Sequence, residues 1–181
     1  MRHVAAVLVA LGMLAGACAT TEGSDAGAVT TTAAPDPSSD IYSAATKQIV
    51  AVDNTFGGQP VFSTVLVVDH VDPDTGSLDG ARGEERPLTS EERAAIEAAL
   101  EGVAEVQFIG DESEYVTEDL APALEGSAIV TLGAIEHRED HSLVGMSLWC
   151  GGLCGIWLTY RLVNGPDAWT VTGTEGPIAI S

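Results

Sequence analysis

The chain has 181 residues, of which 27 are Asp or Glu and only seven are Lys or Arg, so its formal net charge is −20. A field of this sign repels nucleic acid and anionic lipid headgroups, which argues against a DNA- or RNA-binding role. The length is sufficient for one domain with a hydrophobic core.

Residues 1–17 have the pattern of a signal peptide. Arg2 supplies a positive charge, residues 4–14 are uncharged and mostly apolar, and residues 15–17 are small. The whole uncharged run, residues 4–17, reaches only about 21 Å as a helix, which is too short for a bilayer core of about 30 Å. We therefore expect an exported protein without a permanent transmembrane anchor.

The small residues before Cys18 are similar to a lipobox, in which this cysteine is diacylated and becomes the mature N-terminus. The match is incomplete, because Ala15 stands where a lipobox usually has Leu, and Leu14 lies one place too early. Residues 15–17 also fit the A-x-A rule for ordinary secretion. We favour lipid attachment at Cys18 and an extracytoplasmic location at the cell membrane, with secretion as the alternative.

Residues 18–39 are dominated by small and polar side chains, with Val29 as the only large apolar residue. Such a segment buries too little surface to offset the entropy of ordering it. We expect a flexible tether that spans about 25 Å on average. Residues 40–181 then form a single globular domain.

Two helices follow from the sequence pattern. The first is capped by Ser39 or Asp40. In the second, Thr89 and Glu92 form a capping box and Gly102 ends the helix. The expected apolar stripes are Ile41, Ala45, Ile49 and Val52 in the first helix and Ile96, Ala99 and Leu100 in the second.

The remaining apolar runs are typical of β-strands, and four of them lie close together in the last third of the chain. The first two runs are separated by a polar, turn-rich segment at 72–87 and by the second helix. The predicted strands are 61–70, 103–109, 128–136, 142–149, 155–163 and 168–172.

The last four strands fit an antiparallel meander. Its three loops predict three opposed pairs: Cys150 with Cys154, Val163 with Ala168, and His137 with His141. With these pairs the large apolar side chains of all four strands share one face, and a slip of one residue would scramble that face. The sequence therefore predicts an α+β fold, with a curved antiparallel sheet, a C-terminal four-stranded meander, and two or more helices packed on it.

The other face of this meander is a candidate binding face. It combines Trp149 and Trp157 with the small residues Gly145 and Ser147 and with Arg161. Large aromatic edges above a floor of small residues are typical of a groove. Glycine within a strand also marks a close approach by another group. The alternative is that a helix covers this face.

Cys150 and Cys154 are the only cysteines of the predicted domain, and export places them in an oxidising compartment. Opposed residues of a hairpin lie within disulfide distance, so we expect the two cysteines to be joined. A ring of five residues stabilises the fold by only about 2 kcal/mol. The C-x-x-x-C spacing differs from that of redox motifs.

The sequence predicts no metal site and no cofactor site. His137 and His141 lie in a turn, about 26 Å of strand away from the cysteines, so these residues do not converge on zinc. The acidic turn at 72–80 lacks the ligands of a calcium loop. None of the common hydrolase, Walker or Rossmann motifs is present, and no catalytic residue is identified.

The C-terminal segment is similar to a signature of uncharacterised exported bacterial proteins and lipoproteins, approximately CGGLCG…Y…W-x-V. The residues that carry the similarity are 149–155, Tyr160 and 169–173, with 129–135 before them. The resemblance implies export and a recurring cysteine pair, and it implies no activity.

Together these features favour a non-enzymatic binding or interaction domain of the cell envelope, attached to the membrane through its N-terminal lipid. Its ligand or protein partner is not identified by the sequence. The alternative is an envelope hydrolase, or another enzyme, that uses acidic residues.

Overall fold

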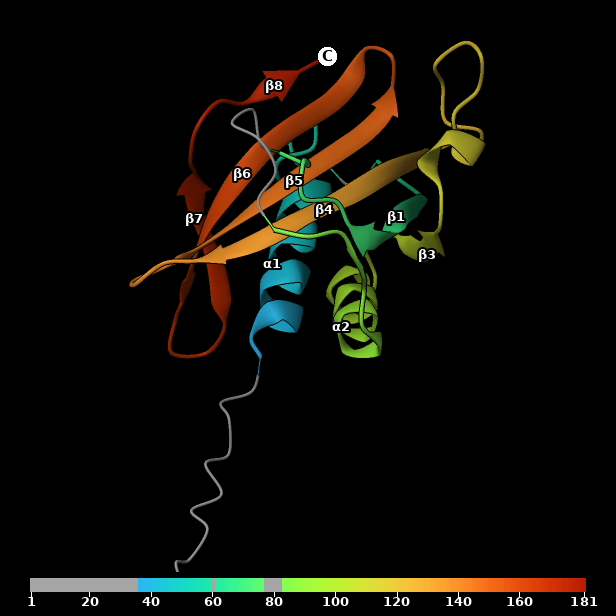
Figure 1. Cartoon of the computed structure of the whole chain (residues 1–181). Helices are drawn as coiled ribbons and strands as arrows, with labels where there is room; N and C mark the ends of the chain where they lie inside the picture. Colours follow the sequence, from blue (N-terminus) through green and yellow to red (C-terminus); the bar gives the residue numbers. More distant parts are fainter. Residues whose placement is uncertain (1–35, 60, 77–82) are drawn as a thin grey trace, which may run out of the picture. The chain divides into compact units, whose positions relative to one another are not determined.

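The computed structural model describes residues 36–59, 61–76 and 83–181 (Figure 1). The predicted signal peptide, Cys18 and the predicted tether up to residue 35 lie outside these ranges. The helices are α1 (Ser38–Ala51), α2 (Ser90–Leu100) and the short 3-10 helix η1 (Glu112–Tyr115). The strands are β1 (Thr64–Val71), β2 (Arg86–Pro87), β3 (Glu105–Ile109), β4 (Ser127–His137), β5 (Ser142–Gly151), β6 (Cys154–Asn164), β7 (Trp169–Thr174) and β8 (Ala179–Ile180).

The strands form one sheet in the order β2-β1-β4-β5-β6-β7, with β3 beside β1 and β8 beside β6. The antiparallel meander β4 to β7 and the α+β class are as predicted. The sheet is nevertheless mixed, because β1 pairs in parallel with both β3 and β4. A parallel connection needs a crossover, and α2 provides it between β1 and β3.

Helix α1 begins at Ser38, one or two residues before the predicted cap. The carboxylate of Asp36 accepts hydrogen bonds from the backbone N–H and the hydroxyl of Ser38. Val52, predicted to continue the apolar stripe, is instead 52% exposed, because the helix ends at Ala51. The buried part of the stripe is Ile41, Ala45 and Ile49.

Helix α2 has the predicted capping box. The Thr89 hydroxyl accepts from the Glu92 backbone N–H at 3.1 Å, and the Glu92 carboxylate accepts from the Thr89 backbone N–H at 2.8 Å. Ile96 and Leu100 are fully buried. Gly102, at φ +75°, adopts the left-handed conformation that follows many helices.

Both helices pack on the same side of the sheet and leave the other side open to the loops (Figure 1). Apolar residues of α1 and α2 share one core with the inward residues of β1 and of the meander. Among the described residues, no helix is both long enough and apolar enough to cross a membrane. The meander contributes Val130, Leu132, Val144, Met146, Leu148, Ile156, Leu158, Tyr160 and Leu162 to this core.

The central register of the meander is as predicted. Leu148 lies opposite Ile156 across β5 and β6, and it lies opposite Val130 across β4 and β5. The predicted pairing of His137 with His141 is wrong: a β-bulge after Leu132 shifts the register by one, and His137 pairs with Ser142.

The pairing of β6 with β7 differs from the prediction by two residues. Leu162 lies opposite Val171, and Asn164 lies opposite Trp169, whereas the prediction paired Val163 with Ala168. Because side chains alternate with a period of two, this shift keeps Trp169 and Val171 on the core face. The predicted face is therefore correct although the predicted register is not.

Candidate functional site

On the face of the sheet opposite the helices, the loop that follows β1 covers Gly133 and Gly145. The Thr75–Gly76 backbone lies directly on Gly145, and a Cβ added at Gly145 would overlap the Thr75 carbonyl oxygen. The Thr159 hydroxyl donates to the Gly76 carbonyl at 2.9 Å and holds the loop in place. The sequence predicted that another group lies close to the strand glycines, and in the structure this group is the backbone of the Thr75–Gly76 loop.

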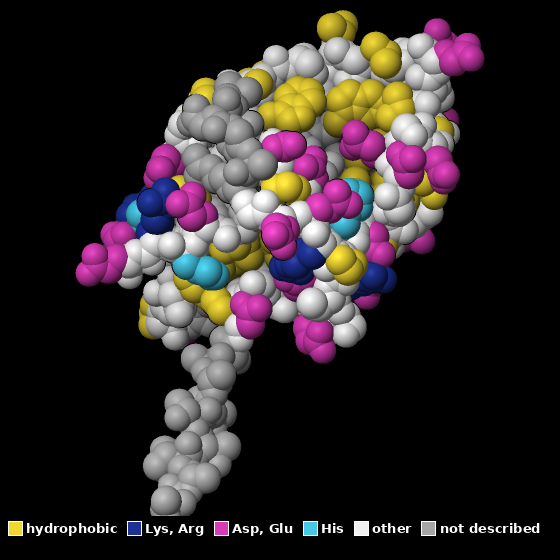
Figure 2. Space-filling model, in the orientation of Figure 1, with side chains coloured by type: hydrophobic (Ala, Val, Ile, Leu, Met, Phe, Trp, Pro, Cys, Tyr) yellow, Lys and Arg dark blue, Asp and Glu magenta, His cyan; other side chains and the backbone are white. Residues whose placement is uncertain are grey.

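Beside this loop a pocket of about 420 Å³ opens on the same face. Its floor is formed by three neighbouring strands, through Thr131, Ser147 and Trp157. Figure 2 shows acidic side chains around a hollow, beneath a band of hydrophobic side chains. The walls come from the end of β1 with the following loop and from the loop after β3: Val68, His70, Asp72, Asp74, Thr75, Gly110, Asp111 and Glu112.

Two floor residues are nearly buried, and their unpaired hydroxyl groups are open to the pocket. Thr131 and Ser147 lie opposite each other across β4 and β5, and each residue is only 7% exposed. Neither hydroxyl has a hydrogen-bond partner among the described residues. Because both residues line the pocket, this pair of hydroxyls is available to a ligand there.

Two of the four carboxylates in the pocket walls have no partner among the described residues, and the other two accept hydrogen bonds. Hydrogen bonds from the side chain and backbone of Ser113 hold the pKa of Asp111 below its usual value, and nearby His70 acts in the same direction. The carboxylates of Asp74 and Glu112 are exposed and make no hydrogen bond or ion pair with the described residues. The Asp72 carboxylate instead accepts from the backbone and side chain of its own turn.

The predicted binding-face residues are only partly brought together. Ser147 and Trp157 line the pocket. Gly145 lies beneath the Thr75–Gly76 loop, and Trp149 packs against a small hydrophobic cluster. Arg161 forms an ion pair with Asp140 at 3.2 Å, away from the pocket. The wall residues were missed because they come from two loops that are far apart in the sequence.

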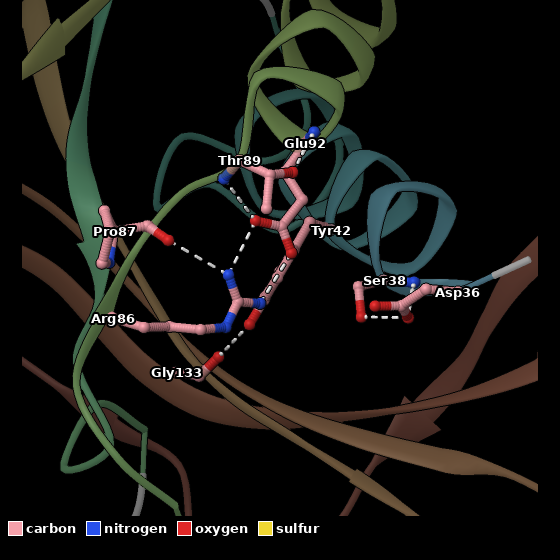
Figure 3. A network of polar contacts seen from close by, with 8 residues as sticks. All are labelled: Asp36, Ser38, Tyr42, Arg86, Pro87, Thr89, Glu92 and Gly133. Carbon is pink, nitrogen blue, oxygen red and sulfur yellow. Dashed lines mark hydrogen bonds and ion pairs between the residues drawn. The ribbon is translucent and has the colours of Figure 1, made fainter.

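A second polar cluster lies between the helices and β2 (Figure 3). The Arg86 guanidinium donates two hydrogen bonds to the Glu92 carboxylate, at 2.8 and 2.6 Å, and lies over the Tyr42 ring. The Tyr42 hydroxyl donates to the Gly133 carbonyl at 3.0 Å. Burial raises the pKa of Tyr42 well above its usual value. An adjoining cavity of about 860 Å³ is open, but these polar groups are bonded to each other, and we assign them a structural role.

The two predicted turn histidines bind neighbouring side chains. The Nδ1 of His137 lies 2.9 Å from the Ser142 hydroxyl, and the Nδ1 of His141 lies 2.5 Å from an oxygen of Asp140. Within the described ranges, no three His, Cys, Asp or Glu side chains are arranged to hold a metal ion.

The hairpin between β5 and β6 carries the predicted disulfide. Cys150 and Cys154 are joined, with their Cα atoms 5.0 Å apart. Cys154 nevertheless pairs with Gly151 in the ladder, because a bulge at Cys150 shortens the predicted three-residue loop to Gly152 and Leu153. The Gly152 backbone N–H donates to the Leu120 carbonyl at 2.8 Å, which joins the hairpin to the segment before β4.

Exposed hydrophobic side chains gather at the end of the domain that carries this hairpin. Leu153 is 94% exposed at the tip, and Leu120 lies against Gly152. A groove of about 450 Å³ next to Cys150 is lined mainly by apolar side chains. We call this surface the apolar end; its residues are Val52, Phe56, Val61, Leu120, Leu124, Leu153, Ile178 and Ile180, the large hydrophobic side chains that are exposed in the described ranges.

Comparison with known proteins finds no match: no family model fits the chain, and no curated protein or solved structure is significantly similar to it. The similarity of the C-terminal segment to exported proteins stays an expectation from the sequence. Function is therefore inferred from the surfaces described above.

Proposed function

We propose that this chain is a non-enzymatic interaction module of the cell envelope, tethered at its N-terminus, which docks a partner protein on the apolar end. The observation that carries the proposal is the concentration of exposed hydrophobic side chains around the Cys150–Cys154 hairpin. Soluble domains rarely expose large contiguous apolar patches, and such patches mark interaction sites.

The charge around the apolar end indicates the chemistry of the partner. Glu125 lines the groove next to Cys150, and Asp53 lines a second groove of about 630 Å³ beside Val52 and Ile178. Glu118 and Asp119 are exposed directly before Leu120. None of the described Lys or Arg side chains lines these grooves. A partner that inserts apolar side chains flanked by Lys or Arg fits this surface, whereas a second copy with a charge of −20 is repelled.

The position of the apolar end suits a tethered domain. Helix α1 begins at Ser38 and runs for 14 residues, about 20 Å, toward the apolar end that begins at Val52. The predicted tether is therefore joined to the domain at the opposite end of α1 from Val52.

The proposed anchor predicts the mature N-terminus. We expect the protein extracted from the membrane fraction to begin at Cys18 and to carry two or more acyl chains, because one chain alone binds a membrane only marginally. Intact-mass spectrometry of the native protein and of a Cys18→Ser variant measures this. A chain in the culture medium, unmodified and beginning at residue 18 or later, would instead establish ordinary secretion.

The docking proposal is tested by cross-linking in native membranes. We expect a photo-cross-linking residue at position 153 to give one discrete protein adduct, and the cross-linked partner peptide to contain Lys or Arg. Leu120→Asp should lower the adduct yield by about tenfold, since burying a leucine contributes about 1.5–3 kcal/mol. Leu120 has a φ of +55°, a conformation that Asp tolerates, so the variant is expected to fold.

The control is Ala98→Asp, which adds the same charge on an exposed position of α2 and should leave the adduct unchanged. An adduct that is insensitive to Leu120→Asp contradicts the proposal. So does an adduct that consists of two copies of this chain or of lipid.

A hydrolase is the second candidate, because His70 and several carboxylates line one pocket. Two observations count against it. The Ser147 hydroxyl has no base within hydrogen-bond distance among the described residues, so it is not an activated nucleophile. Asp111 has a lowered pKa, which favours the charged form over the protonated form that a general acid needs.

A further inference from the structure

We propose that the pocket on the open face binds a small organic ammonium ion. This inference concerns a different surface from the apolar end and does not depend on the docking proposal. It rests on two independent features of the pocket: unpaired hydroxyl groups with a tryptophan at its floor, and carboxylates around its sides.

The floor provides the evidence that the pocket is built for a ligand. Thr131 and Ser147 are more than nine-tenths buried, face each other across two strands, and line the pocket with hydroxyls that have no partner in the described part of the chain. Both hydroxyls are open to the pocket rather than sealed in the core, so their hydrogen bonds are completed by whatever occupies it. Each hydroxyl both donates and accepts, so the floor fits a ligand that carries a polar group of its own.

The walls select a positively charged ligand. The Asp111 carboxyl is held in its charged form by Ser113, and the carboxylates of Asp74 and Glu112 have no cation beside them in the described ranges. Trp157 adds an aromatic side chain to the same pocket, and aromatic faces attract organic cations. His70 is the one basic group of the lining, so acidic groups dominate the pocket.

The spacing of the acids fits an organic cation better than a bare metal ion. A calcium or magnesium ion needs several oxygens within about 2.6 Å, and no three acidic or histidine side chains of the described residues converge in this way. The volume of about 420 Å³ instead falls in the range of organic ligand sites. An anionic ligand such as a phosphate is repelled by the same carboxylates.

The experiment compares choline with 3,3-dimethylbutan-1-ol, a neutral molecule of nearly the same shape. Each is titrated into the mature chain at constant ionic strength and followed by amide chemical shifts. We expect choline to give saturable shifts centred on Asp74, Glu112, Thr131 and Ser147, and the neutral analogue to bind at least about tenfold more weakly. Equal binding of the two, or no saturable shift with choline, overturns the proposal.

Matched variants separate the pocket from the general acidity of the chain. Asp74→Asn with Glu112→Gln should weaken choline binding about tenfold, whereas Glu97→Gln with Glu101→Gln removes the same charge from the α2 region and should have little effect. Ser147→Ala should weaken binding about threefold to tenfold. Equal losses in the two double variants would show attraction by the overall field, and displacement of choline by calcium or magnesium would show a metal site; either result overturns the proposal.

Discussion

Gly145→Ala is expected to lower the free energy of unfolding by about 2–3 kcal/mol, although it adds only one methyl group. The new Cβ would overlap the Thr75 carbonyl oxygen, which belongs to the backbone and has no rotamer to change. The loop has little room to move, because a Cβ at Gly76 would itself overlap the Leu158 carbonyl, and Thr159 holds the Gly76 carbonyl. Urea unfolding followed by tryptophan fluorescence measures the effect.

Gly110→Ala is the matched control, because Gly110 lines the same pocket on its other wall. A Cβ at Gly110 meets nothing within 4 Å, and its φ is not in the left-handed region. The change in stability should stay within about 0.5 kcal/mol. Equal stability of the Gly145→Ala variant and the parent would show that the 72–76 loop is not packed on the sheet.

Arg86→Met is expected to lower the free energy of unfolding by about 2–3 kcal/mol at neutral pH. The Glu92 side chain is 3% exposed and accepts two hydrogen bonds from a guanidinium that is 40% exposed. Removing Arg86 leaves a buried carboxylate without its cation. Arg138→Met, which breaks an exposed ion pair with Glu136, should change stability by less than about 0.5 kcal/mol.

The pH dependence distinguishes a lost ion pair from lost packing. Burial alone raises the pKa of Glu92, but hydrogen bonds from Arg86 and Thr89 outweigh it, and the net pKa lies below the usual value of 4.5. This contribution to stability is present above pH 4.5 and is lost as pH falls through the lowered pKa. The deficit of the Arg86→Met variant should therefore shrink in acid. A deficit that is constant from neutral pH to well below 4.5 would show that only packing was lost.

Local features of this protein follow from its sequence. The capping box of Thr89 and Glu92 spans three residues, and its hydrogen bonds form wherever a helix starts there. The pairing of Leu148 with Ile156 follows from a short hairpin and from the two-residue period of strands. The Cys150–Cys154 disulfide depends on the same hairpin.

For the β4–β7 meander, the sequence predicted which side chains face the core better than it predicted which residues pair across neighbouring strands. The bulge after Leu132 and the two-residue shift between β6 and β7 change which residues face each other, yet they keep the core residues inside. The alternation of apolar and polar residues along a single strand is enough to indicate which side chains are buried. Several strand registers bury the same side chains. The choice among them depends on packing against the helices and on the turn at Gly165.

The candidate sites needed the tertiary structure. Ser147 and Trp157 were assigned to a binding face from the sequence, but His70 comes from the end of β1 and Asp111 from the loop after β3, 41 residues later. Only the parallel pairing of β1 with β3 and β4 brings those loops to one edge. The Arg86–Glu92 pair was missed for a related reason, since the orientation of β2 against α2 is set by packing.

The sequence by itself determined the helices, the meander, its buried face and the disulfide, because each is specified by contacts within a few residues or by a strict repeat. The tertiary structure decided what lies on the other face of the sheet. There the loop at Thr75 lies on Gly145, acidic residues line one pocket with Ser147, and the segment at Leu120 contacts the hairpin. These contacts join distant parts of the chain, and their geometry depends on how the whole sheet packs.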